Sequence, residues 1–550
     1  MRRNLESLSK TTFDLLVIGG GVTGACVARD AARRGMKVAI VEKEDFAHAT
    51  SAHNSKLIHG GLRYLRNFEL GLVRESLKER RIWQRIAPHL VQPLPFMLPV
   101  YNGGFRARAT LGAGLTLYDT LSFDRTWLDD PGQRLGGHRW LSAKKAVARE
   151  PLVEGPGLEG AFLYYDAQMY APERLALECV TDAVVHGAEA ANHLSAENLL
   201  MREGRVEGAA VQENFSGARF DIRAKLTLLA AGPWADLFIE RALGKPSVHR
   251  LTRSKGIHLV VPAMTQETAL TLATGEGHFF VLPWRGHSIL GTTDTNFMGL
   301  PDSVGVSESD IASFIDVINA HLPNAHLTRE MVEHFYAGLR PLVDDGGANK
   351  DTYAASRRAE LIDHGKDDGL DGLFSAIGGK WTTSRELAEK TVDAIAGKLG
   401  GKYNECTTAS AKLPGAPDAP FADFVRAQSD ENESIRNIEH LCRLYGAQLP
   451  KVLECAGNKP GMRAQLAPSG DIGAQILFAI EDEMAMTLED VVMRRTGIGQ
   501  LGDPGEAALD ESVWLMATEL EWNAARRQSE LDTLAANFRV QGARVFSNGK

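Results

Sequence analysis

The sequence predicts an α/β fold built from a doubly wound domain, an antiparallel β-rich cap and a helical C-terminal domain. Three observations predict it. Residues 13–42 read strand, glycine-rich turn, helix, strand; residues 250–345 have mostly β patterns; and after a Pro/Gly-rich stretch at 413–420 the pattern is nearly all helical. With 550 residues, the chain is too long for one compact core, so two or three domains are expected.

The first unit predicts a dinucleotide site. An apolar run at residues 15–18 is typical of a buried parallel strand, and a second strand at 38–41 ends at Glu42. Between them stand three glycines at GxGxxG spacing: Gly19, Gly21 and Gly24. They permit a tight turn, close approach of backbone N–H groups to a pyrophosphate, and close helix–strand packing. Glu42 stands where a ribose hydroxyl needs an acceptor.

The next stretch, residues 43–65, is a predicted loop that returns over the cofactor, because it is rich in Ser, Thr, Asn, His and Gly and has little periodicity. A polar surface loop is the alternative, but long ordered loops are usually functional. Side chains that could bond a pyrophosphate or flavin edge are Thr50, Ser51, Ser55 and Lys56, and those that could face the other side are His59, Arg63 and Tyr64.

Two later segments also point at the cofactor. An apolar strand at 226–231 runs into Gly232-Pro233, which indicates backbone close to the cofactor. A strand at 373–377 meets Gly378-Gly379, and Thr382 then leads into a helix whose N-terminus favours an anion or carbonyl oxygen.

Composition excludes several classes. The net charge of −9 argues against general nucleic-acid binding. Five scattered cysteines without a CxxC pair indicate a reducing compartment and neither a disulfide framework nor a zinc site. We expect no secretory signal, because no apolar run precedes Phe13, and no membrane span, because no stretch approaches 18 apolar residues. A protein lying on a membrane surface remains compatible.

Two segments are candidates for such a surface. Residues 67–87 have a helical pattern with a basic face, for which a plain solvated face is the favoured interpretation. Residues 105–121 carry two arginines ahead of a Leu/Gly-rich run, and partly buried connecting structure is an equally good interpretation there.

Several motifs together resemble the FAD-dependent (aerobic, quinone-linked) glycerol-3-phosphate dehydrogenases: SKLIHGGLRYL (55–65), HFFVLPW with GTTDT (278–295), AGLRPL (337–342), IGGKWTTSRELAE (377–389) and EDEMAMTLEDVVMRRT (481–496). The resemblance covers nearly the whole chain. It implies a glutathione-reductase-like FAD domain at 1–77, 155–237 and 350–410, a substrate/cap domain at 78–154 and 238–349, and a helical domain at 411–550.

The resemblance also implies an activity. The family oxidises sn-glycerol 3-phosphate to dihydroxyacetone phosphate, with hydride passing to flavin N5 and electrons to a membrane quinone. Peripheral attachment at the cytoplasmic side of the inner membrane and a possible homo-oligomer are expected. No EF-hand pattern is present, and no metal is expected.

The matched motifs imply roles for single residues. The expected catalytic residues are His59, His258, Arg340 and Lys380; the expected substrate-binding residues are Arg63, Tyr64, Arg340, Arg357 and Lys380; the expected cofactor-binding residues are Gly19, Gly21, Gly24, Glu42, Thr50, Ser51, Ser55, Lys56, Leu57, Gly232, Gly379 and Thr382. Guanidinium groups suit a phosphate, and histidine suits removal of the hydroxyl proton. His59 is the preferred base, with His258 as its orienting partner.

Departures and alternatives remain. Where many family members carry acidic residues after Tyr-x-Asp, this chain has Ala171-Pro172-Glu173, which leaves the local contacts open. The absence of a long insertion typical of soluble oxidases favours a quinone acceptor. The alternatives are a flavin oxidase of glycerol 3-phosphate or another hydroxy or amino acid using oxygen, and an assembly module with a structural flavin.

Overall fold

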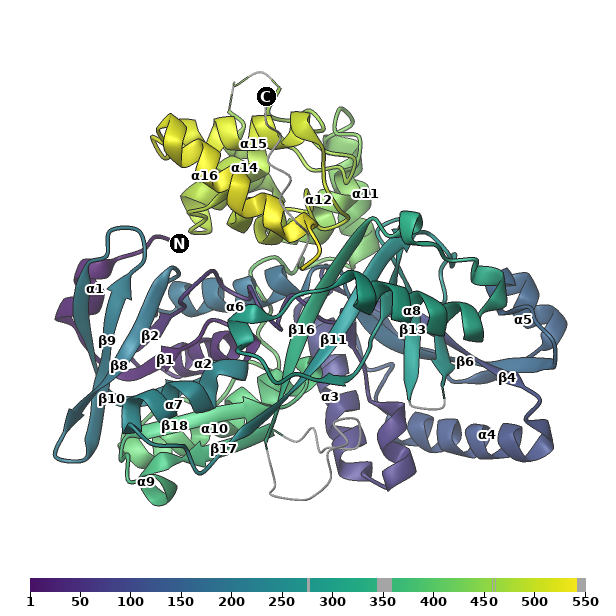
Figure 1. The fold of residues 1–550 in the computed structure, drawn as a ribbon, viewed down its shortest axis with the longest axis horizontal. Helices are drawn as coiled ribbons and strands as arrows, with labels where there is room; N and C mark the ends of the chain where they lie inside the picture. Colours follow the sequence, from purple (N-terminus) through teal and green to yellow (C-terminus); the bar gives the residue numbers. More distant parts are fainter. Residues whose placement is uncertain (275–276, 344–358, 458, 460, 542–550) are drawn as a thin grey trace.

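The computed structural model describes residues 1–541 apart from 275–276, 344–358, 458 and 460. Figure 1 shows three parts: an α/β part that holds the N-terminus, a second sheet beside it, and C-terminal helices stacked above both. These parts agree with the predicted fold class.

The first sheet has eight strands among the described residues, with the path β17-β18-β10-β1-β2-β7. Its inner pairs, β18–β10–β1–β2–β7, are all parallel, as a doubly wound sheet requires. The strands are β1 (Thr12–Ile18), β2 (Val38–Val41), β7 (Glu189–Ala191), β8 (Leu194–Arg202), β9 (Arg205–Glu213), β10 (Arg219–Leu229), β17 (Ala359–Asp363) and β18 (Leu373–Gly378).

Both faces of this sheet are covered, because alternate residues of β1 enter different cores. Leu15 and Val17 pack on one side, where the main helices are α2 (Val22–Arg33), α6 (Pro172–Val185) and α10 (Ser384–Leu399). Leu16 and Ile18 pack on the other side with β8–β10 and α7 (Ala235–Leu243). A strand buried on both faces explains the unbroken apolar run at its end.

The second sheet has ten strands among the described residues: β3 (Leu57–Ile58), β4 (Val91–Tyr101), β5 (Arg139–Ser142), β6 (Leu158–Met169), β11 (Leu251–Pro262), β12 (Ala269–Ala273), β13 (His278–Trp284), β14 (His287–Gly291), β15 (Thr295–Asn296) and β16 (His334–Val343). All its pairs except β4–β12 are antiparallel. It corrects the predicted boundaries in one respect: β3 and β6, assigned to the FAD domain, pair in this sheet.

The register of β11 against β16 decides the chemistry of this sheet. Ser254 lies opposite Arg340, Gly256 opposite Gly338, and His258 opposite Tyr336. Because side chains alternate with period two, these pairs project from one face. The glycine pair therefore places no side chain between an arginine and a histidine. Arg340 Nη2 and Thr292 Oγ1 pack over Gly256, and the His53 carbonyl oxygen packs over Gly338.

The cap also carries most of its helices on one end: α3 (Leu70–Ile86), α4 (Gly104–Leu121), α5 (Ala143–Arg149) and α8 (Glu308–His321). The predicted basic face of α3 is largely engaged, since Arg74 pairs with Asp124 at 2.7 Å and Arg81 with the same carboxylate at 3.2 Å. α4 is the candidate 105–121 segment, and of its residues only Leu115 and Tyr118 are buried. Across the described residues, no helix combines the length and apolar character needed to cross a bilayer.

The C-terminal domain holds α11 (Phe421–Glu431), α12 (Ile438–Tyr445), α13 (Leu449–Cys455), α14 (Gly473–Asp482), the π-helical turn η10 (Asp490–Arg495), α15 (Glu506–Glu519) and α16 (Ala524–Ala535). α15 and α16 are separate helices, divided near Leu520, within the C-terminal region that was predicted to be nearly all helical.

The remaining elements are short: α1 (Leu5–Lys10), α9 (His364–Asp367) and the 3₁₀ turns η1 (Leu62–Asn67), η2 (Pro131–Gln133), η3 (Pro151–Val153), η4 (Gly232–Trp234), η5 (Pro301–Ser303), η6 (Pro323–Ala325), η7 (Arg329–Met331), η8 (Trp381–Thr383), η9 (Gly446–Gln448) and η11 (Ala536–Phe538).

Buried ion pairs fasten the C-terminal domain to the first sheet. Arg495 donates two hydrogen bonds to Asp45, at 2.6 and 2.7 Å, and Arg494 donates a third at 2.7 Å. Arg174 of α6 binds Glu483 in the same bidentate way, at 2.7 and 3.0 Å. Arg174, which directly follows the altered segment Ala171-Pro172-Glu173, thus has a structural partner.

Candidate active site

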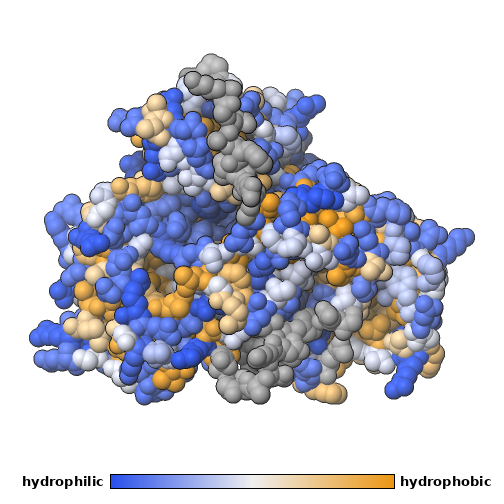
Figure 2. Space-filling view, viewed as in Figure 1, coloured by the Kyte–Doolittle hydropathy of each residue, from blue (hydrophilic) through white to orange (hydrophobic). Residues whose placement is uncertain are grey.

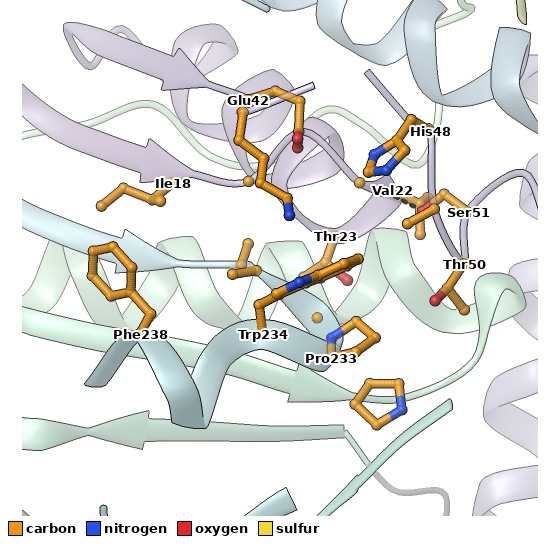
Figure 3. A pocket seen from close by; sticks show the side chains of 18 of the residues that line it. Ile18, Val22, Thr23, Glu42, His48, Thr50, Ser51, Pro233, Trp234 and Phe238 are labelled. Atoms are coloured by element: carbon orange, nitrogen blue, oxygen red, sulfur yellow. Dashed lines mark hydrogen bonds between the residues drawn. The ribbon is translucent and has the colours of Figure 1, made fainter. Parts of the chain in front are cut away.

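A cavity of about 550 Å³ opens at the carboxyl ends of β1, β2 and β10. This is where an open α/β sheet binds ligands. Ile18 and Phe238 lie at one end, Thr50 and Ser51 at the other, and Pro233 and Trp234 between them (Figure 3).

The glycine-rich turn fits a close-packed phosphate group. A Cβ on Gly19 would lie 2.5 Å from the Ala230 carbonyl oxygen, and one on Gly24 would lie 1.9 Å from the Gly19 carbonyl oxygen. Gly19 also has φ +111°, which only glycine adopts readily. The N-terminus of α2 lines the cavity through Gly21, Val22 and Thr23, so its positive end faces the space a pyrophosphate would fill.

Glu42 closes the turn. Its carboxylate accepts hydrogen bonds from the backbone N–H of Gly20 at 2.6 Å and of Glu44 at 3.0 Å, and burial raises the pKa of this carboxyl group. Glu42 lines the cavity beyond the strand end, in the position expected for an acceptor of ribose hydroxyls.

The far wall of the cavity joins the two sheets. Thr50 Oγ1 donates to the Leu339 carbonyl of β16 at 2.7 Å, and Trp381 Nε1 donates to the Ser51 carbonyl at 3.1 Å. Pro341, next to Arg340, lines the cavity together with Lys380. The cap sheet therefore forms part of the cofactor cavity.

At this junction Lys380 meets the 59–65 loop. Its ammonium donates to Ser76 Oγ at 3.0 Å and lies 3.9 Å from the centre of the Tyr64 ring. The Arg63 guanidinium lies 4.8 Å from the same ring and donates to the Tyr64 hydroxyl at 3.0 Å. Tyr64 thus holds two cations close to each other.

Arg340 is partly buried and hydrogen-bonded to hydroxyl groups. Nη1 donates to Ser254 Oγ at 3.1 Å and Nη2 to Thr292 Oγ1 at 2.8 Å, while the carboxylate of Asp294 stands 3.9 Å away. Burial, with a contribution from Arg63, lowers the pKa of Arg340, but an arginine stays charged at any physiological pH. The site therefore places Arg340 close to Arg63.

His258 lies on the same strand face as Arg340, with Gly256 and Gly338 between them. Its Nε2 is 2.9 Å from Ser55 Oγ, and its ring stacks on Tyr336 with centroids 4.9 Å apart. Burial, then the charges of Arg340 and Lys56, hold its pKa well below 6.5, so the imidazole is neutral. Its Nδ1 is buried without a hydrogen-bond partner among the described residues, as expected for an atom that a ligand completes.

His59 sits beside η8: its backbone N–H donates to Thr382 Oγ1 at 3.1 Å. The following Gly60 donates to Asp166 Oδ1 at 3.2 Å, and that buried carboxylate also accepts from Arg80 and from the Tyr118 hydroxyl. Asp166 thus fixes the loop that carries His59 and Arg63.

Five predicted site residues, placed above, do not line the cofactor cavity: His59, Arg63, Tyr64, His258 and Arg340. The other predicted site residues fall into three groups. Those that line the cofactor cavity are Gly19, Gly21, Glu42, Thr50, Ser51, Gly232, Gly379 and Lys380. Those that do not line it are Gly24, which packs behind the turn, and Ser55, Lys56, Leu57 and Thr382. Arg357 lies outside the described residues. Their roles as ligands of cofactor and substrate stay predictions.

Other residues of the site were not predicted. Ser254 and Thr292 accept hydrogen bonds from Arg340. Gly256 and Gly338 lie between Arg340 and His258 in the strand register. Trp234, Phe238 and Arg241 line the cofactor cavity. The GTTDT motif holds Thr292 and was a usable signal. The others depend on strand register or on a helix far along the chain, which no local pattern reveals.

Comparison with known proteins agrees with this geometry. Residues 14–392 match the family described as FAD dependent oxidoreductase, and residues 406–527 match the C-terminal domain of alpha-glycerophosphate oxidase. The family match shows that the cofactor is FAD, and the glycine turn, the N-terminus of α2 and Glu42 fit such a dinucleotide in the 550 Å³ cavity.

Individual relatives extend over most of the chain. A glycerol-3-phosphate dehydrogenase of Synechocystis is 38% identical over 92% of this chain and 93% of its own length, and an aerobic glycerol-3-phosphate dehydrogenase of Bacillus subtilis is 32% identical over 97% and 96%. The crystal structure of the glycerol-3-phosphate dehydrogenase from Bacillus halodurans complexed with FAD has a TM-score of 0.77 and 28% identity, covering 97% of this chain and 95% of its own. The chain therefore belongs to the FAD-dependent oxidoreductases and, among them, to the glycerol-3-phosphate dehydrogenase family.

Proposed function

We propose that this enzyme oxidises sn-glycerol 3-phosphate to dihydroxyacetone phosphate and passes the electrons to a membrane quinone. The observation that carries the proposal is one face of β11 and β16, which carries both Arg340 and the neutral His258. The names of the relatives and the adjoining FAD cavity support the same reaction.

In this proposal the phosphate binds at the cationic end. Arg340 and Arg63 are close enough to influence each other's charge, and their planar forks suit phosphate oxygens. The hydroxyl partners of Arg340 orient its guanidinium, and its ion pair with Asp294 is long, at 3.9 Å. An anionic ligand therefore gains more there than at an arginine in close contact with a carboxylate.

At the other end, His258 accepts the proton of the C2 hydroxyl as the substrate is oxidised. We favour His258 over His59, because His258 lies on the same strand face as Arg340 and is held in the neutral form. FAD supplies the acceptor for the hydride from C2. Lys380, at the junction of cavity and cap, stabilises the negative charge that reduction brings.

An anaerobic titration tests the reaction. The absorbance of the bound flavin should bleach with sn-glycerol 3-phosphate and return when a soluble quinone analogue is added. A flavin that stays oxidised with excess substrate contradicts the proposal. Reoxidation by oxygen at the turnover rate, with stoichiometric peroxide, would favour the oxidase alternative instead.

We propose that the α4 surface contacts the membrane, on the cytoplasmic side of the inner membrane. Its exposed apolar side chains are Phe105 (86% exposed) and Leu117 on the helix, and Phe123 and Trp127 just after it. Arg106 and Arg108 are exposed on the same helix. Figure 2 shows hydrophobic and hydrophilic residues side by side at this end of the molecule. Aromatic rings beside arginines suit an interface with anionic lipid.

Vesicle flotation tests this surface. The double variant Phe105→Ser/Trp127→Ser should lose most of its binding to vesicles of phosphatidylglycerol and phosphatidylcholine. Trp514→Ser, which removes an equally exposed ring from α15, should bind as the wild type does. Equal binding by all three proteins contradicts the assignment.

A further inference from the structure

A second, smaller cavity lies behind the active-site face. It measures about 40 Å³ and is formed where the 48–56 loop, β16, α6 and the C-terminal domain meet. Its volume is enough for roughly two or three water molecules. Its lining includes the side chains of Lys56, Glu173, His48, His53, His334 and Tyr336.

Lys56 is the unusual member of this set. It was predicted to bind the cofactor, yet its ammonium is in the second cavity, 4.8 Å from the Trp284 ring centre and 5.3 Å from that of Tyr336. Only 5% of the residue is exposed, and its hydrogen bond to the Ala52 carbonyl is long, at 3.5 Å. Among the described residues, no carboxylate lies within ion-pair distance of it.

The surroundings leave Lys56 as the group that titrates near neutral pH. Burial, opposed by Glu173, lowers the pKa of Lys56 to about 8. Burial also lowers the pKa of His48 to about 3, of His53 to about 4 and of His334 to about 3, so these imidazoles stay neutral. The other charged groups that face it are Arg285 near Trp284, and Glu489 and Arg494 of the C-terminal domain, which pair with each other at 2.8 Å.

One aromatic ring separates this ammonium from His258. Tyr336 stacks on the His258 imidazole at 4.9 Å and is fixed by its hydroxyl, which donates to the Asn54 carbonyl at 3.0 Å. Since Lys56 Nζ is 5.3 Å from the same ring centre, it lies at most about 10 Å from the imidazole. At that separation, inside protein, one charge shifts a neighbour's ionisation by roughly one pH unit.

We propose that Lys56 is a positioning residue of the reaction: from the second cavity, its charge weakens His258 as a proton acceptor, and loss of that charge strengthens it. The inference rests on the proposed role of His258. No bond is made to Lys56. The proton leaves the C2 hydroxyl for His258 in either state, and Lys56 sets how readily the imidazole holds it.

The test is the rate constant for flavin reduction by sn-glycerol 3-phosphate, measured by anaerobic rapid mixing of holoenzyme between about pH 6 and 10. In the wild type this rate should rise roughly threefold as Lys56 loses its proton near pH 8. Lys56→Met should stay at the upper level throughout, because no charge is present. Lys56→Arg should stay at the lower level, because arginine keeps its charge.

A matched control removes the same charge from an exposed position. Lys145→Met, on α5, should keep the wild-type step. If Lys56→Met does not retain FAD, the arginine variant decides: a step near pH 8 that survives in Lys56→Arg overturns the inference. A wild-type flavin that the substrate does not reduce defeats the proposed function itself, whereas reduction without a Lys56-dependent step defeats only this inference.

Discussion

Arginines in two regions of the molecule differ in the kind of group that their guanidinium contacts. At the junction with the C-terminal domain, Arg495 and Arg494 lie 2.6–2.7 Å from the carboxylate of Asp45. At the active-site face, Arg340 bonds Ser254 and Thr292, and its carboxylate neighbour is 3.9 Å away. A paired arginine holds a structure together, whereas one bonded to hydroxyls keeps its charge for a ligand. Burial alone therefore does not distinguish a structural from a functional charge.

The largest expected effect is on activity at the ligand-directed arginine. Arg340→Met should lower kcat/KM for sn-glycerol 3-phosphate by roughly 10²–10³, mostly through KM, because two charge-assisted hydrogen bonds to the phosphate are lost. Its free energy of unfolding should fall only slightly, since the ion pair with Asp294 is long, at 3.9 Å, and Asp294 keeps its hydrogen bond from Ser254. Steady-state kinetics and urea unfolding measure both. An unchanged KM would rule out the role given to Arg340.

The paired arginine should show the reverse pattern. Arg495→Met leaves Asp45 buried with half its partners and should cost about 3–5 kcal/mol of unfolding free energy. The KM of whatever folded enzyme remains should be unchanged, because the junction is outside the active-site face. A variant as stable as the wild type would remove the contrast between the two regions.

A smaller effect is expected from adding a side chain at Gly256. A Cβ on Gly256 would stand 2.5 Å from Arg340 Nη2 and 2.4 Å from Thr292 Oγ1, so Gly256→Ala must displace the guanidinium. We expect kcat/KM to fall roughly 10- to 100-fold, since a small misplacement of a binding group is costly. Gly71→Ala, where nothing lies within 4 Å, is the control and should leave kinetics unchanged. Wild-type kinetics in Gly256→Ala would show that the exact position of the Arg340 guanidinium does not matter for turnover.

The smallest effect is the pH dependence of the junction. His193 Nε2 is 2.9 Å from Asp490, and although burial opposes it, the charge of Asp490 raises the pKa of His193 above 6.5. Its contribution to stability is therefore complete below pH 6.5 and is lost as pH rises through the raised pKa. Unfolding free energy should fall by on the order of 1 kcal/mol over this window. Equilibrium urea unfolding of His193→Gln should show no such fall; a parallel fall in the variant would assign it to another group.

Local patterns predicted much of the fold and the cofactor cavity. The strand, the glycine turn and Glu42 are adjacent in sequence, and all of them line or shape the cavity as expected. Boundaries were predicted less well: β6 joined the cap sheet because its partner, β4, is about 60 residues upstream, and a strand's own pattern does not name its partner.

The directions of single side chains were beyond local reasoning. Ser55 and Lys56 are neighbours in a loop, and Lys56 has a positive φ. Ser55 bonds His258, whereas Lys56 lines a separate cavity. A motif match gives such residues a neighbourhood but no orientation. Although residues 171–173 differ from the family pattern, the next residue, Arg174, has a carboxylate partner, Glu483 of the C-terminal domain.

The sequence by itself determined the dinucleotide unit and the family, because these depend on motifs whose residues lie within a few positions of one another. Only the tertiary structure decided which charges are paired. Asp45 meets Arg495 across 450 residues, and Arg340 meets Ser254 across 86, through domain packing and strand register. Pairing is a property of distances in space, and it distinguishes the arginines in close contact with Asp45 from Arg340, for which we propose an anionic ligand.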